Sequence, residues 1–192
     1  MSLELDRAKT ALVVIDLQKG IVAAGRTLAP HSSEEVVRNA ARLADAFRRH
    51  GMPVFLVHVV AGPHERLNVV ADDPGWRPSG PPSPDASEFV PELTPREGDL
   101  PITKKQWGAF YGTELELQLR RRGMTTIVLC GVSTNYGVES TARFAYEYGF
   151  QQVFAEDAMS SGSVEMHQAT VNFVLKRIGR VRTTGEILEA LG

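Results

Sequence analysis

The chain has 192 residues, of which 43% are hydrophobic and 23% are charged, and its formal net charge is −2 at pH 7. This length suits one domain with a buried core, and the near-neutral charge gives no reason to expect binding to nucleic acid or to an anionic membrane. No apolar run approaches the roughly 20 residues that span a bilayer, and MSLELDRAKT does not resemble a signal peptide. We therefore expect a single domain over residues 1–192 in the cytoplasm. The single cysteine, Cys130, agrees with a reducing compartment.

The first part of the chain places a helical pattern between two apolar runs. TALVVID (10–16) is rich in β-branched residues, which predicts a strand covered on both faces. SSEEVVRNAARLADAFRRHG (32–51) starts with serine and acidic residues and ends with arginines and glycine, which predicts an amphipathic helix. PVFLVHVV (53–60) predicts a second strand.

Residues 61–101 interrupt this pattern, because they hold most of the 11 prolines of the chain and show no stable periodicity. Proline cannot donate the backbone hydrogen bond that a packed element needs. We expect an ordered excursion over the surface that acts as a lid or as an oligomer contact. A disordered insertion is the alternative.

The alternation resumes after the excursion and continues to the C-terminus. Apolar runs predict strands over residues 100–105, 125–131, 151–157 and 180–184. Amphipathic patterns predict helices over residues 113–123, with Thr113 as the cap, and over 163–179 and 185–192. Residues 133–149 predict a loop that leads into a further helix. Six strands alternating with five or six helices predict a Rossmann-like, three-layer α/β/α fold with a mostly parallel six-stranded sheet.

Polar residues follow several of the predicted strands. Asp16 ends the first strand, Lys104 and Lys105 end the third, and residues 131–135 follow the fourth. In an open parallel sheet the ligand crevice lies beyond the carboxyl ends of the strands, so these groups converge on one edge. Each also has a structural interpretation: an aspartate can cap a turn, a lysine pair can be a solvated edge, and the turn can simply begin a helix.

Four segments, in this order, resemble the isochorismatase-like hydrolase superfamily, also called cysteine hydrolases: ALVVIDLQKG, ITKKQWGAFYGTELELQLRRRG, GVSTNYGVESTARFAYEYG and FAEDAMSS. The resemblance runs from about residue 10 to residue 185. It implies a catalytic aspartate at Asp16 and a catalytic lysine at Lys104, with Lys105 as a variable neighbour. At the position of the nucleophilic cysteine, this chain has Gly137.

The same resemblance implies which residues surround the substrate. They are Gln18, Trp107, Phe110, Val132, Ser133, Thr134, Asn135 and Tyr136. It also implies a cis peptide bond between Val132 and Ser133, with backbone N–H groups aimed at the substrate. The aromatic rings of Trp107 and Phe110 would wall the pocket or an interface, with core packing as the alternative.

The loss of the cysteine restricts the chemistry. Cys130 lies within an apolar strand, where a thiol behaves as a small buried hydrophobe, so we expect no nucleophilic role for it. True isochorismatases resemble this chain in having glycine at the cysteine position. In them an aspartate protonates an enolpyruvyl vinyl ether, and water adds to the oxocarbenium carbon. Their turn resembles Tyr-Ala-His-x-Gly, whereas this chain has Ser133, Thr134 and Asn135.

Two functions remain open at this point. The first is a hydrolase that acts on a small, anionic molecule with Asp16 as acid and base, and the second is a non-catalytic binding or regulatory protein that has lost the thiol. We expect no cofactor and no metal, because the sequence carries no nucleotide-binding glycine motif and its five histidines show no paired ligand spacing. The family and the proline-rich excursion lead us to expect a homo-oligomer.

Overall fold

The computed structural model describes residues 3–23, 25–60, 62, 64–65, 67, 69–73 and 82–192. Its centre is a six-stranded sheet with the order β3-β2-β1-β4-β5-β6, in which every neighbouring pair is parallel. The strands are β1 (Thr10–Ile15), β2 (Val54–Val59), β3 (Leu100–Lys104), β4 (Thr126–Val132), β5 (Gln151–Ser160) and β6 (Arg180–Arg182). The chain builds the sheet outward from β1 to β3, and then continues from β4 on the other side of β1. The strand order therefore reverses between β1 and β4, and this switch point is where an open parallel sheet opens a crevice.

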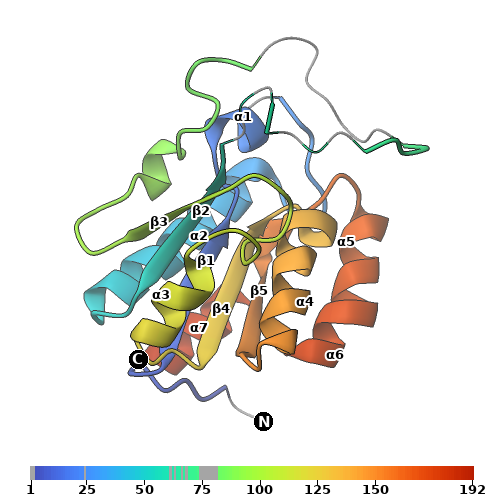
Figure 1. The fold of residues 1–192 in the computed structure, drawn as a ribbon. Coiled ribbons are helices and arrows are strands. Elements are labelled where there is room, and N and C mark those ends of the chain that lie inside the picture. The colour runs from blue at the N-terminus through green and yellow to red at the C-terminus, as the bar shows by residue number, and fades with distance from the viewer. Residues whose placement is uncertain are drawn as a thin grey trace.

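Helices cover both faces of the sheet (Figure 1), which confirms the three-layer α/β/α arrangement. One face carries α2 (Ser33–Arg49) and α7 (Thr184–Leu191), and the other carries α3 (Leu115–Arg121), α4 (Glu139–Glu147), α5 (Val164–Thr170) and α6 (Lys176–Ile178). Two π-helical turns, η2 (Thr134–Val138) and η3 (Val171–Leu175), lead into α4 and join α5 to α6. The short helix α1 (Lys19–Val22) lies beyond the carboxyl ends of the strands.

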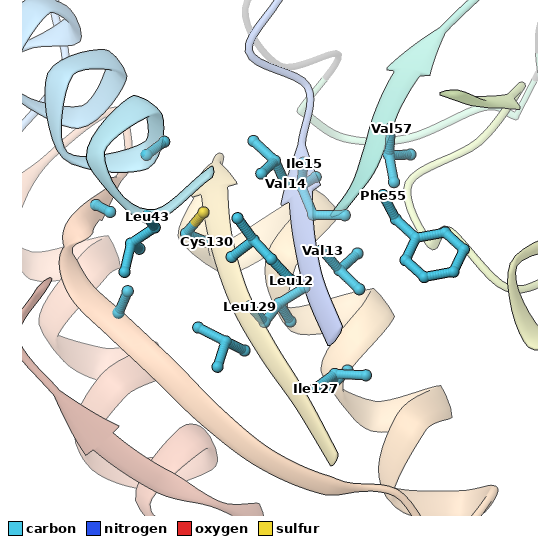
Figure 2. Close-up of a cluster of buried hydrophobic side chains, with 14 of the residues drawn as sticks. Leu12, Val13, Val14, Ile15, Leu43, Phe55, Val57, Ile127, Leu129 and Cys130 are labelled. Carbon is cyan, nitrogen blue, oxygen red and sulfur yellow. The ribbon is translucent and has the colours of Figure 1, made fainter. Parts of the chain in front are cut away.

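The core is centred on the two middle strands. Every residue of β1 is buried, as expected for a parallel strand that is covered on both faces. Figure 2 shows Leu12, Val14, Leu43 and Cys130 in the same cluster of buried side chains, which joins β1 and β4 to α2. Burying an aliphatic side chain of this size contributes about 1.5–3 kcal/mol, so these strands provide a rigid base for the loops that follow them.

Helix α2 begins and ends as the sequence predicts. The Ser32 side chain accepts a hydrogen bond from the backbone N–H of Glu35, which satisfies one of the free donors of the first turn. Gly51 follows the helix with φ of 65°, a conformation that glycine adopts without a steric penalty. Arg48, in the last turn, forms an ion pair with Asp99 at 2.7 Å.

Other bounds differ from the sequence prediction. Helix α3 begins at Leu115 with Glu114 as its N-cap, although the Thr113 hydroxyl still accepts a hydrogen bond from the N–H of Leu115. Strand β5 continues to Ser160, because its pairing with β4 resumes after an irregularity in the register. Helix α1 was not expected, since four residues carry too little periodicity to be recognised.

The returning part of the proline-rich excursion is ordered. Residues 86–89 run beside α1, and the chain then leads to the start of β3 through a 3₁₀ turn, η1 (Pro91–Leu93). Within the motif PSGPPSP (78–84), residues 78–81 lie outside the described residues, as do positions 61, 63, 66, 68 and 74–77 of the excursion. Among the described helices, none combines the length and apolar character needed to cross a bilayer.

Gly131 allows the two central strands to approach each other, which leads to a prediction. Its φ is 113°, and a Cβ atom there would lie 2.1 Å from the carbonyl oxygen of Ile15 and 2.6 Å from its nitrogen. Gly131→Ala should therefore lower the free energy of unfolding by more than about 4 kcal/mol, measured by urea denaturation. Gly185→Ala is the control, because its nearest contact would be 3.8 Å, and it should leave stability equal or slightly higher. Equal effects of the two substitutions would contradict this account of Gly131.

Candidate active site

Asp16 is the first residue after β1 and stands at the switch point of the sheet. Its backbone N–H donates to the carbonyl of Val57 at 2.9 Å, which continues the pairing with β2 for one more residue. Its φ is 56°, a left-handed conformation that is uncommon for a residue other than glycine. Unusual backbone conformations of this kind occur often at functional sites, because there the surroundings compensate for their cost.

Lys104 lies at the end of β3, two strands away from β1, and its side chain reaches across to Asp16. Its Nζ atom is 2.8 Å from Asp16 Oδ2 and also donates to the carbonyl of Trp107 at 2.5 Å. The Lys104 side chain is completely buried, and the residue Asp16 is only 6% exposed. The two charges therefore face each other in a medium that solvates them poorly.

Burial decides the protonation of the carboxyl group. It raises the pKa of Asp16 to about 6, and the charge and hydrogen bond of Lys104 oppose this rise only in part. Asp16 Oδ1 is buried and has no hydrogen-bond partner among the described residues, whereas Oδ2 accepts from Lys104. A proton on this carboxyl group is therefore expected on Oδ1, and the protonated form is accessible near neutral pH.

Gly137 faces the same carboxyl group from the turn after β4. A Cβ atom built on Gly137 would lie 3.1 Å from Asp16 Oδ2, 3.0 Å from Ile15 Cγ2 and 3.2 Å from the carbonyl oxygen of Val132. A side chain at this position would therefore point at Asp16. The turn begins with a cis peptide bond between Val132 and Ser133, as the family resemblance implied.

A cavity of about 700 Å³ opens beside Asp16. The expected site residues that line it are Asp16, Gln18, Trp107, Val132, Ser133, Tyr136 and Gly137. The rings of Trp107 and Tyr136 form one wall, with their centroids 4.8 Å apart. Lys104 does not line the cavity, because it lies behind Asp16 and acts on the cavity only through the carboxyl group.

Three of the expected side chains lie away from the cavity, which corrects the sequence-based expectation for them. Phe110 is buried, with its ring centroid 5.4 Å from that of Tyr148, so its role is core packing. Thr134 Oγ1 lies 2.9 Å from His167 Nδ1, and Asn135 Oδ1 accepts from the Ser161 hydroxyl. The hydroxyl of Thr134 and the amide of Asn135 therefore attach the turn to the sheet and to α5.

Gln18 lines the cavity, but its amide is fully engaged. Its Oε1 accepts from the N–H of Val59 at 2.7 Å, and its Nε2 donates to the carbonyls of Val59 and Ala86 at 3.1 and 3.0 Å. Gln18 therefore clamps the end of β2 to the segment that returns from the excursion. It shapes the cavity by holding its wall.

That returning segment forms a wall of the cavity, and the sequence analysis, which expected a lid or an oligomer contact within residues 61–101, did not identify these residues. The N–H of Gly20 donates to the carbonyl of Ala86 at 2.9 Å, and a Cβ on Gly20 would lie only 2.7 Å from Ala86 Cβ. Lys19 adds ion pairs to Asp85 at 3.0 Å and to Glu88 at 2.8 Å. The further lining residues that sequence reasoning missed are Gly20, Ile21, Arg26, Val59, Val60, Leu67, Asp73, Pro82, Ser83, Pro84, Ala86, Ser87, Lys105 and Gln106. The only signal for this wall was the glycine after the first strand, which allows the close approach.

Within the described ranges, no group of three or more His, Cys, Asp and Glu side chains is arranged to hold a metal ion. His58 contacts the carbonyl of Ser87 and the hydroxyl of Thr103, which agrees with a structural role.

The fold is α/β, and a buried carboxyl–ammonium pair lies at the switch point of its sheet. Comparison with known proteins shows the family to which the chain belongs. Residues 10–186 match the model of the isochorismatase domain, and the chain belongs to the isochorismatase family. It is 51% identical over 189 residues to "Uncharacterized isochorismatase family protein YwoC" of Bacillus subtilis strain 168, covering 98% of this chain and 97% of that protein.

Two further relatives extend the comparison. The chain is 30% identical over 184 residues to a "Probable isochorismatase" of Pseudomonas chlororaphis, covering 96% of this chain and 87% of that protein. The solved structure of an isochorismatase family protein from Burkholderia thailandensis superposes with a TM-score of 0.91 at 42% identity, covering 100% of this chain and 99% of that one.

The two positions that concern thiol chemistry give a prediction. Cys130 is fully buried, and burial raises the pKa of its thiol, so iodoacetamide should not alkylate the native protein until denaturant is added. Gly137→Cys should introduce one thiol beside Asp16, because a Cβ at this position would lie 3.1 Å from Asp16 Oδ2, and this thiol should react with iodoacetamide in the native protein. Peptide mapping after alkylation at several pH values distinguishes the two thiols. Alkylation of Cys130 in the folded protein would contradict its structural role.

Proposed function

We propose that this protein hydrolyses a small, anionic molecule without a thiol nucleophile, by proton transfer from Asp16 to a vinyl ether. The observation that carries the proposal is the buried Asp16 carboxyl group, whose pKa of about 6 makes it a competent acid and which lines the cavity beside Gly137.

Thiol chemistry has no support in this chain. Nucleophilic attack by a cysteine requires a thiolate that can reach the substrate. The sequence contains a single cysteine, Cys130, and it is buried in the sheet with its pKa raised by burial. Gly137 holds the position that would point a side chain at Asp16, and it has none. An acid-catalysed route is therefore the chemistry that these residues favour.

The proposed reaction needs one acid and one water molecule. The Asp16 carboxyl group transfers its proton to the terminal carbon of an enolpyruvyl ether, which becomes a methyl group and leaves an oxocarbenium ion. Water adds to the oxocarbenium carbon, and the proton that this water loses returns to the Asp16 carboxylate. The resulting hemiketal breaks its bond to the ether oxygen and releases an alcohol and pyruvate.

Lys104 and the cavity walls support this assignment. When Asp16 has given up its proton, the Lys104 ammonium group, 2.8 Å from Oδ2, stabilises the carboxylate in its buried surroundings. Arg26 and Lys105 line the cavity and offer cationic groups to the carboxylate of an enolpyruvyl group. Asp73 lines the same cavity, and Lys105 also pairs with Glu65. Kinship with the probable isochorismatase of P. chlororaphis points to the same substrate class.

A non-catalytic binding protein is the competing function, because the turn differs from that of true isochorismatases at Ser133, Thr134 and Asn135. The test is incubation with isochorismate and simpler enolpyruvyl ethers, with pyruvate release followed by a coupled dehydrogenase. Amides and ureas are screened in parallel. Tight binding of an enolpyruvyl ether without turnover would favour the binding protein.

The single-domain bounds, the homo-oligomer and the cytoplasmic location stay predictions.

Replacement of the acid should separate catalysis from stability. Asp16→Asn keeps the shape of the side chain but cannot donate the proton, so turnover should fall by about 10²–10⁴-fold. Asp99→Asn is the matched control, because the Asp99 side chain is buried, pairs with Arg48 and does not line the cavity. Rates are divided by the folded fraction measured by circular dichroism. Near-normal turnover of Asp16→Asn would rule out this residue as the acid.

The pH dependence should follow the same group. The acid form of Asp16 predominates below its pKa of about 6, so kcat/KM should be flat below pH 6 and fall about tenfold per pH unit above it. Lys104 lowers the pKa of Asp16 through its charge and hydrogen bond. Lys104→Met should therefore move the midpoint of this fall to higher pH, in addition to any loss of rate. A midpoint that stays in place would show that another group titrates.

A further inference from the structure

A line of hydrogen-bonding side chains lies outside the cavity, beneath the turn that carries Gly137. Thr134 Oγ1 lies 2.9 Å from His167 Nδ1, and His167 Nε2 lies 2.9 Å from Glu156 Oε1. His167 and Thr134 are buried, and Glu156 is partly buried on β5. We propose that His167 is a positioning residue, which fixes the turn of residues 133–138 against Asp16 through its contact with Thr134. The inference rests on the proposed function, because it assigns a task to a part of that site.

The contacts determine which atoms carry the protons. His167 and then His31 hold the pKa of Glu156 below its usual value, so its carboxylate is ionised and accepts hydrogen bonds. In the tautomer of His167 that carries its hydrogen on Nε2, the ring donates to Glu156. Nδ1 of this tautomer accepts from the hydroxyl of Thr134. The Thr134 hydroxyl and both ring nitrogens of His167 thus have partners, which fixes the rotamer of Thr134.

The line continues on the far side of Glu156 into helix α2. Glu156 Oε1 also lies 3.3 Å from His31 Nε2, and His31 Nδ1 lies 3.1 Å from Glu35 Oε1. Both ring nitrogens of His31 face carboxylate oxygens, and only the imidazolium form donates to both. The network therefore ties the turn to β5, α5 and the start of α2, which are all firmly packed.

The turn is also held by hydrogen bonds outside this network, among them the contact of Asn135 with Ser161. Its residues 134–138 form the π-helical turn η2, and the N–H groups of Tyr136 and Val138 both donate to the carbonyl of Ser133, at 3.0 and 3.2 Å. Thr134 is fully buried and lies three residues before Gly137. The Thr141 hydroxyl donates to the carbonyl of Gly137 at 2.7 Å.

A small shift of this turn changes the reacting geometry. A Cβ on Gly137 would already lie within 3.0–3.2 Å of Ile15, Asp16 and Val132. A displacement of even a few tenths of an ångström therefore alters the space beside the Asp16 carboxyl group. Proton transfer depends steeply on such distances, so a residue that acts only through Thr134 can control the rate.

The experiment uses the thiol introduced by Gly137→Cys as a reporter of the turn, so that it does not require a known substrate. The pH profile of its alkylation by iodoacetamide is measured alone and after a second substitution. Thr134→Val removes the hydroxyl at nearly constant shape, and Thr134→Ser retains it. The side chain of His167→Asn places an amide near the position of Nδ1, whereas that of His167→Gln places it near Nε2. Cys130, in the same samples, reports unfolding, because it is protected only in the folded protein.

Thr134→Val and His167→Gln should change the alkylation rate of the reporter thiol at pH 7 by about tenfold, which corresponds to a shift of about one pKa unit, because the thiol moves relative to the Asp16 carboxyl group. Thr134→Ser and His167→Asn should leave the alkylation rate close to that of Gly137→Cys alone, since both retain the contact between residues 134 and 167. An unchanged profile with a lowered melting temperature would mean that the network serves stability alone, and would overturn the inference. Alkylation of Cys130 in Thr134→Val, or equal losses in His167→Asn and His167→Gln, would overturn it as well.

Without the reporter, His167→Gln should lower kcat more than it changes KM on any enolpyruvyl ether that the protein hydrolyses. If no such substrate is found, the proposed function fails while the alkylation profiles still decide the role of His167. If turnover is found and the profiles do not move, the positioning role fails and the proposed function stands.

Discussion

The site depends on one buried pair of charges, Asp16 and Lys104. Taking a carboxylate and an ammonium group out of water costs several kcal/mol for each ion, and their attraction repays this only when the geometry is good. A contact of 2.8 Å supplies that geometry, yet burial still raises the pKa of Asp16. Asp16 can therefore be ionised or protonated beside the Lys104 ammonium group, with only a small difference in free energy between the two forms near neutral pH. Such a difference suits reversible proton transfer.

The topology of the sheet is what brings the pair together. β1 and β3 are separated by β2, and a lysine has the length to cross the end of one strand. β4 is paired directly with β1, on the side opposite to β2. The turn after β4 therefore reaches the other side of Asp16. A parallel sheet that ends its strands at one edge thus brings Asp16, Lys104 and Gly137 together from three strands, while the buried core below fixes their spacing.

The sequence was sufficient for the fold and for part of the site. Strand-like runs and helix signals predicted the layers, and the rule that ligands bind at strand ends grouped Asp16 and Lys104 with the turn that carries Gly137. The directions of Phe110, Thr134 and Asn135 could not be predicted, because the first packs into the core and the other two lie in or beside a π-helical turn, which does not follow the α-helical spacing. The wall at residues 82–87 was hidden as well, since its docking depends on long-range contacts with α1 rather than on any local pattern.

The wall formed by residues 82–87 is structurally separate from the sheet, which affects how its side chains can be substituted. Residues 82–87 add no strand to the sheet and no side chain to its main core, and they are held to α1 by backbone hydrogen bonds, by the clamp of Gln18 and by the ion pairs of Lys19. Their side chains can be exchanged without disturbing the strands that carry the charged pair. In the proposed function, the residues that shape the cavity and the residues that stabilise the sheet therefore lie in different parts of the chain.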